Sequence, residues 1–332
     1  MKIKIIIGIV LLMIFGVLIL AVFAPKDVGT KVEIKNRDPA VYVQPVVDEK
    51  GLDISRGIIN TEKDKIPNSG AIYEFSKKVL NTADRQKIAK TFGLITYTEK
   101  SLIGTDAFLL EQNRSNFNDR IIISSENQEA VTYSSVASDS AQIKDIRNIE
   151  QWQSEAEKIA SGFELPTGWS VKFEQLVYIK YTTEKEIFGT AENYDAVRFL
   201  YSYDFENKPV YGKNGYPIRF DFSSAGLNTA MIDFIPRMAI LRESNLSTKN
   251  SLQLSDSRQY KPLYVIGDEN YYTYGEVSKY IDILVSNEAF RTGYYFDEKL
   301  KQLWPYVFVD GVVKSKIEGG NAQILLGTSL IL

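Results

Sequence analysis

The sequence predicts an α+β protein in which an N-terminal transmembrane helix precedes repeated modules, each with a helix laid on an antiparallel sheet. Three observations predict this class: an apolar run at residues 5–24, helical spacing of apolar residues at 70–92 and 149–162, and alternating strand-like segments after each of these two. The expected parts are a transmembrane anchor at 1–24, an extracytoplasmic stalk at 25–70, a first helix-plus-meander module at 71–145 and a second, larger module at 146–332.

The apolar run opens the chain. After Lys2 and Lys4, residues 5–24 carry no charge, and twenty helical residues at 1.5 Å each span roughly the 30 Å of a bilayer core. A secretory signal peptide is the alternative, but its apolar region is usually about 7–15 residues long, and Pro25 would directly follow the cleavage site. We therefore expect a single-pass protein of the cell membrane, with residues 5–24 in the bilayer, a cytoplasmic N-terminus and the bulk of the chain outside.

The composition limits the chemistry that the chain can perform. Hydrophobic residues make up 44% and charged residues 24% of the 332 positions, which is typical of a packed globular protein. The net charge of −3 and the absence of a basic block predict no nucleic-acid partner. Cysteine is absent, so there is no disulfide framework. Histidine is also absent, which excludes Ser-His-Asp catalysis and almost every zinc site.

No residue stands out as catalytic, cofactor-binding or metal-binding. The sequence contains no P-loop, no G-x-G-x-x-G, no G-x-S-x-G and no S-x-x-K motif. Only carboxylate chemistry remains, and the 42 Asp and Glu residues are too numerous for one pair to be singled out. We therefore expect a protein without cofactor or metal that is not an enzyme.

Helical spacing predicts three helices, at 70–92, 149–162 and 274–286. Asn68 and Ser69 can cap the first. The apolar face of the second comprises Trp152, Ala156, Ile159 and Ala160. Proline-punctuated residues 25–70 are predicted to be an extended stalk, and polar residues 244–261 a loop.

The helix ends suggest a duplication. The pattern Lys-Ile-Ala-x-x-Phe-x-Leu occurs at 87–94 and again at 158–165, and a strand series follows each copy. The expected strands lie at 107–110, 120–123, 130–133, 171–181, 197–205, 218–222, 230–235, 292–296, 304–309, 312–317 and 323–332, with a turn at Asp310-Gly311 between the ninth and tenth.

The clearest alternation in the chain lies at 197–205. One face carries Val197, Phe199, Tyr201, Tyr203 and Phe205. The other face carries Arg198, Ser202 and Asp204, with Leu200 as an exception. This pattern predicts a half-buried antiparallel strand with a polar outer face. Asn214-Gly215 is typical of a type I′ turn before the next strand.

Residues 199–211 and 215–226 together form an aromatic strand, a polar turn, Pro-Val, a second turn and an alternating strand ending at glycine. This hairpin resembles PepSY-like modules and the YycH/YycI-type membrane-anchored regulators of Gram-positive two-component systems. Residues 303–308 resemble the late strand of those regulators, although Trp304 precedes the proline here. The resemblance implies a non-enzymatic role in which the span and the outer domain contact a membrane histidine kinase. Its motifs are structural, so no functional residue transfers.

Three functions stay open from the sequence. The first is a regulatory or binding protein with a membrane-protein partner. The second is a surface binder of cell-wall glycan or peptide, for which Tyr271-Tyr272 and Tyr294-Tyr295 offer stacking platforms. The third, a carboxylate-based hydrolase, needs two acids about 5–10 Å apart in a cleft.

Overall fold

The computed structural model describes most of the chain after residue 58, within a compact unit that spans Asp38–Leu332. The described residues are 59–76, 80–102, 105–114, 117–124, 130–137, 148–181, 186–188, 191–213, 215–267, 271–272, 281–315 and 321–332. The predicted anchor and the first part of the predicted stalk lie outside them.

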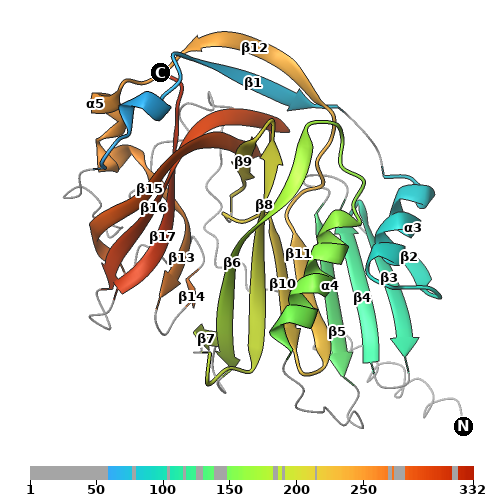
Figure 1. Ribbon diagram of the computed structural model, residues 1–332. Helices are drawn as coiled ribbons and strands as arrows, with labels where there is room; N and C mark the ends of the chain where they lie inside the picture. The colour runs from blue at the N-terminus through green and yellow to red at the C-terminus, as the bar shows by residue number, and fades with distance from the viewer. Residues whose placement is uncertain are drawn as a thin grey trace, which may run out of the picture. The chain divides into compact units, whose positions relative to one another are not determined.

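Strands dominate the described residues (Figure 1). They are β1 (Ser69–Phe75), β2 (Thr98–Ser101), β3 (Ala107–Arg114), β4 (Phe117–Ser124), β5 (Val131–Ala137), β6 (Trp169–Tyr181), β7 (Glu186–Phe188), β8 (Ala196–Phe205), β9 (Lys208–Tyr211), β10 (Ile218–Ser223), β11 (Gly226–Ile232), β12 (Ala239–Ser247), β13 (Lys261–Gly267), β14 (Tyr271–Tyr272), β15 (Ile281–Asp297), β16 (Gln302–Ser315) and β17 (Asn321–Ser329). The helical elements are α3 (Thr82–Thr91), α4 (Ile149–Ser161), the short α5 (Ser251–Leu254) and the 3₁₀ turns η2 (Lys63–Lys65) and η3 (Ser257–Gln259).

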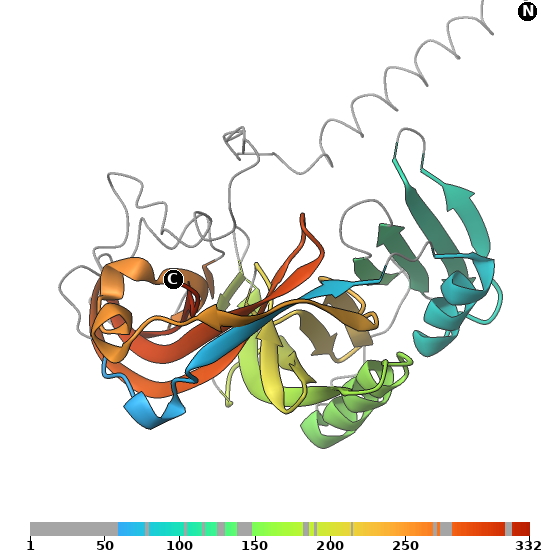
Figure 2. The same cartoon turned by 90° about the horizontal axis from the view of Figure 1, so that it is seen from above.

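Backbone pairing arranges these strands in two antiparallel series. The first runs β2–β3–β4–β5–β11–β10–β8–β6–β7. The second runs β15–β16–β17–β13–β14. Strand β9 connects them, because it pairs antiparallel with β8 and parallel with β15. Figure 2 shows β1 and β12 running side by side, and β1 also pairs with β16.

The predicted fold class is wrong. The described chain is a largely β structure and not a set of repeated helix-on-sheet, PepSY-like modules. The pairing of β5 with β11 places strands from both predicted modules in one sheet. The predicted boundaries of the four segments, 1–24, 25–70, 71–145 and 146–332, stay a prediction.

Two of the three predicted helices are corrected. The predicted helix 70–92 divides into strand β1 and a shorter helix α3, whose start is fixed by a capping box between Asn81 and Asp84. The β-branched and aromatic residues Ile72, Tyr73 and Phe75 favour a strand, and β1 pairs with β12 in place of forming helix. In the predicted helix 274–286, residues from Ile281 onward begin β15, whose long register with β16 overrides the local helical spacing; residues 273–280 lie outside the description.

Two further local predictions are wrong. The predicted turn at Asp310-Gly311 lies inside β16, because Asp310 pairs with Ala289 on one side and Leu325 on the other. The predicted loop at 244–261 contains the end of β12, α5 and η3. Pairing with strands distant in sequence determines β16 and the end of β12, and a local polar pattern carries no information about such pairing. Helix α5 instead begins at a local capping box between Asn250 and Gln253.

Several other described elements agree closely with the sequence, whereas β2, β7, β12 and β13 were not predicted. Helix α4 is confirmed, including its four predicted apolar residues as its buried face. Its Trp152 stacks on Phe222 of β10 with ring centroids 6.2 Å apart. Strands β3, β4, β5, β6, β8 and β10 lie where the alternation predicts them. The ends of the two similar helix segments contact each other, with the Phe92 and Phe163 rings 6.2 Å apart.

No helix in the described part of the chain is long and apolar enough to cross a membrane. Helix α3 has 10 residues and α4 has 13, so at 1.5 Å per residue they extend about 15 and 20 Å, short of the roughly 30 Å of a bilayer core. The predicted span at 1–24 lies outside the described residues. The described chain therefore does not support the predicted localisation, a single-pass membrane protein with an extracytoplasmic bulk.

The contact between β9 and β15 requires a glycine. Tyr294 and Tyr295 of β15 pair in parallel with Val210 and Tyr211 of β9. A Cβ atom on Gly293 would collide with the carbonyl oxygen of Pro209 and would lie 3.0 Å from the Phe308 ring. Only a residue without a side chain permits this approach.

We expect Gly293→Ala to lower the free energy of unfolding by about 1–3 kcal/mol, because the added methyl group forces backbone apart in a packed region. Urea denaturation measures the change. Gly212→Ala is the matched control, since its Cβ would meet nothing closer than a Phe234 ring carbon at 3.8 Å. Equal losses in the two variants would contradict the close-approach explanation.

Candidate functional site

The candidate site lies where the outer face of β6 and β8 meets one face of β15, β16 and β17. An apolar cluster fills part of this contact, and its buried members are Val177, Leu200, Tyr211, Tyr216, Leu263, Tyr306, Phe308 and Leu325. Leu200, the exception in the predicted polar face of β8, is 0% exposed because it packs in this second cluster. The outer face of β8 is therefore an internal surface, and its polar residues lie between strands.

A β-bulge in β6 places the first carboxylate of the site. Phe173 pairs with Tyr201 and Gln175 with Leu200, so Glu174 is the extra residue of the bulge. Glu174 accepts a hydrogen bond from Ser202 Oγ at 2.7 Å, and Lys172 Nζ lies 3.3 Å from the same carboxylate oxygen. Because its side chain is only 8% exposed, these partners offset the cost of burying its charge.

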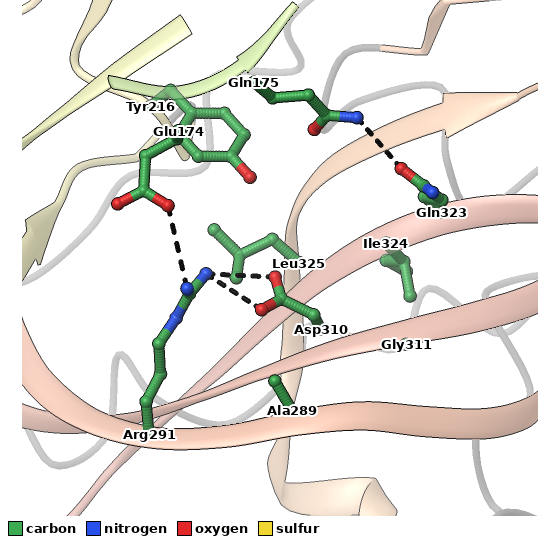
Figure 3. A pocket seen from close by; sticks show the side chains of 10 residues that line it. All are labelled: Glu174, Gln175, Tyr216, Ala289, Arg291, Asp310, Gly311, Gln323, Ile324 and Leu325. Atoms are coloured by element: carbon green, nitrogen blue, oxygen red, sulfur yellow. Dashed lines mark hydrogen bonds and ion pairs between the residues drawn. The ribbon is translucent and has the colours of Figure 1, made fainter. Parts of the chain in front are cut away.

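Arg291 of β15 joins the two walls of the site (Figure 3). Its Nη1 lies 3.6 Å from Glu174 Oε2 on β6, and its Nη2 lies 3.0 Å from Asp310 Oδ2 on β16. Asp310 is two residues from Phe308, which is paired directly with Arg291, so the two charged side chains meet diagonally across neighbouring strands. The guanidinium carbon also lies 5.3 Å from the centre of the Tyr211 ring, within cation–π range.

Asp204 is a third carboxylate near Arg291, after Glu174 and Asp310. It lies on β8 two residues after Ser202, and its Oδ1 is buried without a hydrogen-bond partner among the described residues. Burial raises the pKa of Asp204, the charge of Glu174 raises it further, and Lys172 and Arg291 act in the opposite direction. Asp204 does not line the cavity, but it places beside Arg291 a carboxylate whose ionised form is poorly stabilised.

A cavity of about 250 Å³ opens beside these charges. Figure 3 shows the amides of Gln175 and Gln323 meeting on one side, with Arg291 and Asp310 on the other. Gln175 Nε2 donates to Gln323 Oε1 at 3.0 Å; Gln323 is exposed and Gln175 is half-buried. Tyr216 forms part of the wall, and burial raises its pKa, so its hydroxyl stays protonated.

Lys261 of β13 is the other perturbed cation on this face of the sheet. Its Nζ lies 3.3 Å from the Tyr295 hydroxyl oxygen and 4.8 Å from the centre of that ring. Burial lowers the pKa of Lys261 to about 8. Lys261 does not line the cavity, so we assign it no part in the site.

The sequence assigned no catalytic, cofactor or metal residue. The charged residues of the site, Glu174, Arg291 and Asp310, lie on β6, β15 and β16, and the alternation predicted only the adjoining outer face of β8 to be a polar surface. The missed signal was Leu200, an apolar residue on that otherwise polar face. Of the predicted stacking platforms, Tyr294 is 4% exposed and packs on Tyr73 and Phe205, so it offers no open ring. The side chains of Tyr271 and Tyr272 lie outside the description.

The arrangement provides hydrogen-bonding amides and a fixed array of paired charges. In the described residues, no group of three or more acidic side chains is placed to hold a metal ion. Both Glu174 and Asp310 contact Arg291. A ligand in the cavity would thus meet oriented polar groups that are already held in position.

Comparison with protein-family models, with curated proteins and with solved structures found no match. The resemblance to YycH/YycI-type regulators stays a prediction. The class of protein is therefore argued from the site alone.

We expect Asp204→Asn to raise the free energy of unfolding at pH 7. A raised pKa means that the folded chain holds the Asp204 proton more tightly than the unfolded chain, so ionisation costs stability as pH rises from the unfolded value of about 3.9. The increase in the free energy of unfolding caused by Asp204→Asn should grow as the pH rises above about 4 and vanish below that pH.

Urea denaturation between pH 3.5 and 7 measures this difference. Asp195→Asn, at an exposed residue, is the control for removing one negative charge. A gain for Asp204→Asn that does not change with pH would show that the raised pKa is not its cause.

Proposed function

We propose that this chain is a non-enzymatic binding protein of regulatory type, which receives a polar side chain of a partner polypeptide in the cavity beside Arg291. The observation that carries the proposal is the preformed wall of the cavity, in which the Gln175–Gln323 amide pair faces the Arg291–Asp310 ion pair. Amides donate and accept hydrogen bonds, as peptide groups do, and can exchange their mutual bond for bonds to a partner.

The size of the cavity favours a macromolecular partner. Pockets for whole small molecules measure about 300–1,000 Å³, and this one measures about 250 Å³. It has room for one or two side chains that a larger molecule inserts. With Glu174 and Asp310 against Arg291, the lining charges sum to −1 (one positive, two negative), which favours a basic or amide side chain over an acidic one.

The geometry gives less support to the hydrolase considered from the sequence. Glycoside hydrolysis needs one carboxylic acid that donates a proton and one carboxylate that acts as base or nucleophile. Here Glu174 and Asp310 both contact the same guanidinium, and Ser202 and Lys172 hold Glu174 further. These contacts suit a structural charge network.

Binding can be tested with defined probes. The blocked tripeptides Gly-Lys-Gly, Gly-Gln-Gly and Gly-Glu-Gly, and chitotriose as a glycan, are titrated into the full chain while the amide NMR signal of Gly311 in the cavity wall is followed. We expect the lysine and glutamine peptides to shift this signal and the other two probes not to do so.

We expect Gln323→Ala to weaken peptide binding about two- to tenfold, the range for one hydrogen bond worth about 0.5–1.5 kcal/mol. Gln153→Ala on α4, which also removes a glutamine that is hydrogen-bonded to another side chain, should leave binding unchanged. A response to chitotriose alone would favour the glycan-binding alternative, and no response to any probe would overturn the proposal.

A further inference from the structure

A larger hollow lies between α3, α4 and the segment that follows β11, and we name it the inter-helix groove. Its volume is about 550 Å³. Its floor is apolar, made by Ile88, Phe163 and Ile235. Three lysines at its rim, Lys87, Lys90 and Lys158, and the buried Arg237 in its wall oppose the two acids Asp84 and Glu164. The lining therefore sums to +2 (four minus two), whereas the whole chain carries −3.

Close packing of the helix ends makes the groove a fixed feature. A Cβ atom on Gly162 would lie 2.9 Å from Thr91 Cγ2, so glycine allows the end of α4 to approach α3. Thr91 Oγ1 donates to the Gly162 carbonyl oxygen at 3.5 Å. The Phe92 ring lies against both Phe163 and Tyr133, with centroids 6.2 and 5.1 Å apart.

Helix termini explain only part of the positive charge. Lys90 and Lys158 lie in the last turns of α3 and α4, where a cation also compensates the helix dipole. Lys87 lies a turn earlier, and Arg237 comes from the segment between β11 and β12. Four cations from three separate elements thus converge on one hollow, which is the charge pattern that an anionic partner complements.

One carboxylate already occupies the rim. Glu164 Oε2 lies 2.8 Å from Lys87 Nζ, and the two side chains are 78% and 61% exposed. An ion pair this exposed adds little stability because water and salt screen it, so a carboxylate from another molecule can replace Glu164 at little cost. Glu164 therefore marks the position that an acidic side chain of a partner would take.

We propose that the inter-helix groove binds an extended, acidic peptide segment of a partner protein. From Asp84 to Thr91 the groove follows α3 for about 10 Å, the length of about three extended residues. Asp84 places negative charge at one end, so the acidic residues of the segment lie toward Lys87, Lys90 and Lys158. The site is separate from the cavity beside Arg291 and does not depend on the function proposed for it.

The test uses a fluorescein-labelled heptapeptide with four acidic residues around a central leucine, and the corresponding lysine peptide. Fluorescence anisotropy with the full chain measures binding at low and at physiological salt. We expect the acidic peptide alone to bind, more weakly at higher salt because exposed charges are screened.

Removing positive charge from the rim should weaken binding of the acidic peptide, and removing negative charge should strengthen it. Lys90→Glu with Lys158→Glu should weaken binding more than about tenfold, because like charges then face each other. Glu164→Gln should strengthen it by releasing Lys87. Lys63→Glu with Lys65→Glu, the same charge change on η2, is the control and should cost less than about twofold, the loss expected from long-range charge alone.

Three results would overturn the proposal. These are equal losses in the two double variants, equal binding of the lysine peptide, and no measurable binding of the acidic peptide. Circular dichroism of each variant separates lost binding from lost folding. If a double variant unfolds, the Glu164→Gln variant tests the proposal by itself. Unchanged or weaker binding of the acidic peptide by folded Glu164→Gln protein would contradict the proposed site.

Discussion

Burial of β8 on both faces is the constraint on which the rest of the structure depends. Its inner face, with Phe199, Tyr201 and Tyr203, packs in the main core, and its outer face packs against strands from the end of the chain. A strand with both faces buried must be covered by a packing layer on each face. Strand β9 connects β8 to the second layer, because it pairs with both β8 and β15. The collision of a Cβ on Gly293 with Pro209 shows how closely these backbones approach.

Because both faces of β8 are buried, a charged side chain on this strand must be paired with an opposite charge. Arg198 is 8% exposed and Asp221 is 7% exposed. They form a two-pronged pair across β8 and β10, with bonds of 2.7 and 2.6 Å, and Thr229 donates to the same carboxylate at 3.0 Å. Buried charges require such complete pairing. The alternation placed Arg198 on an outer face, where it would have been an ordinary surface charge.

The sequence predicted local structure well and long-range pairing poorly. The face of α4 and the strands β3–β6, β8 and β10 could be predicted because their signals are periodic within about ten residues. The length of β15, the continuity of β16 through Asp310-Gly311 and the place of β1 beside β12 depend on partners far away in sequence. The site could not be predicted for the same reason: Glu174 and Arg291 are 117 residues apart (291 minus 174) and meet only when the two strand series pack.

Arginine suits the centre of this site for geometric reasons. Its planar guanidinium reaches Glu174 on one wall and Asp310 on the other while lying over Tyr211, whereas the compact ammonium of lysine is a point charge that does not match two carboxylates in this way. The same residues hold the two strand series together and line the cavity. A ligand bound there contacts both walls, so its binding energy adds to the stability of their contact by mass action. Ligand binding at the cavity would thus be linked to the packing of β6 against β15–β17.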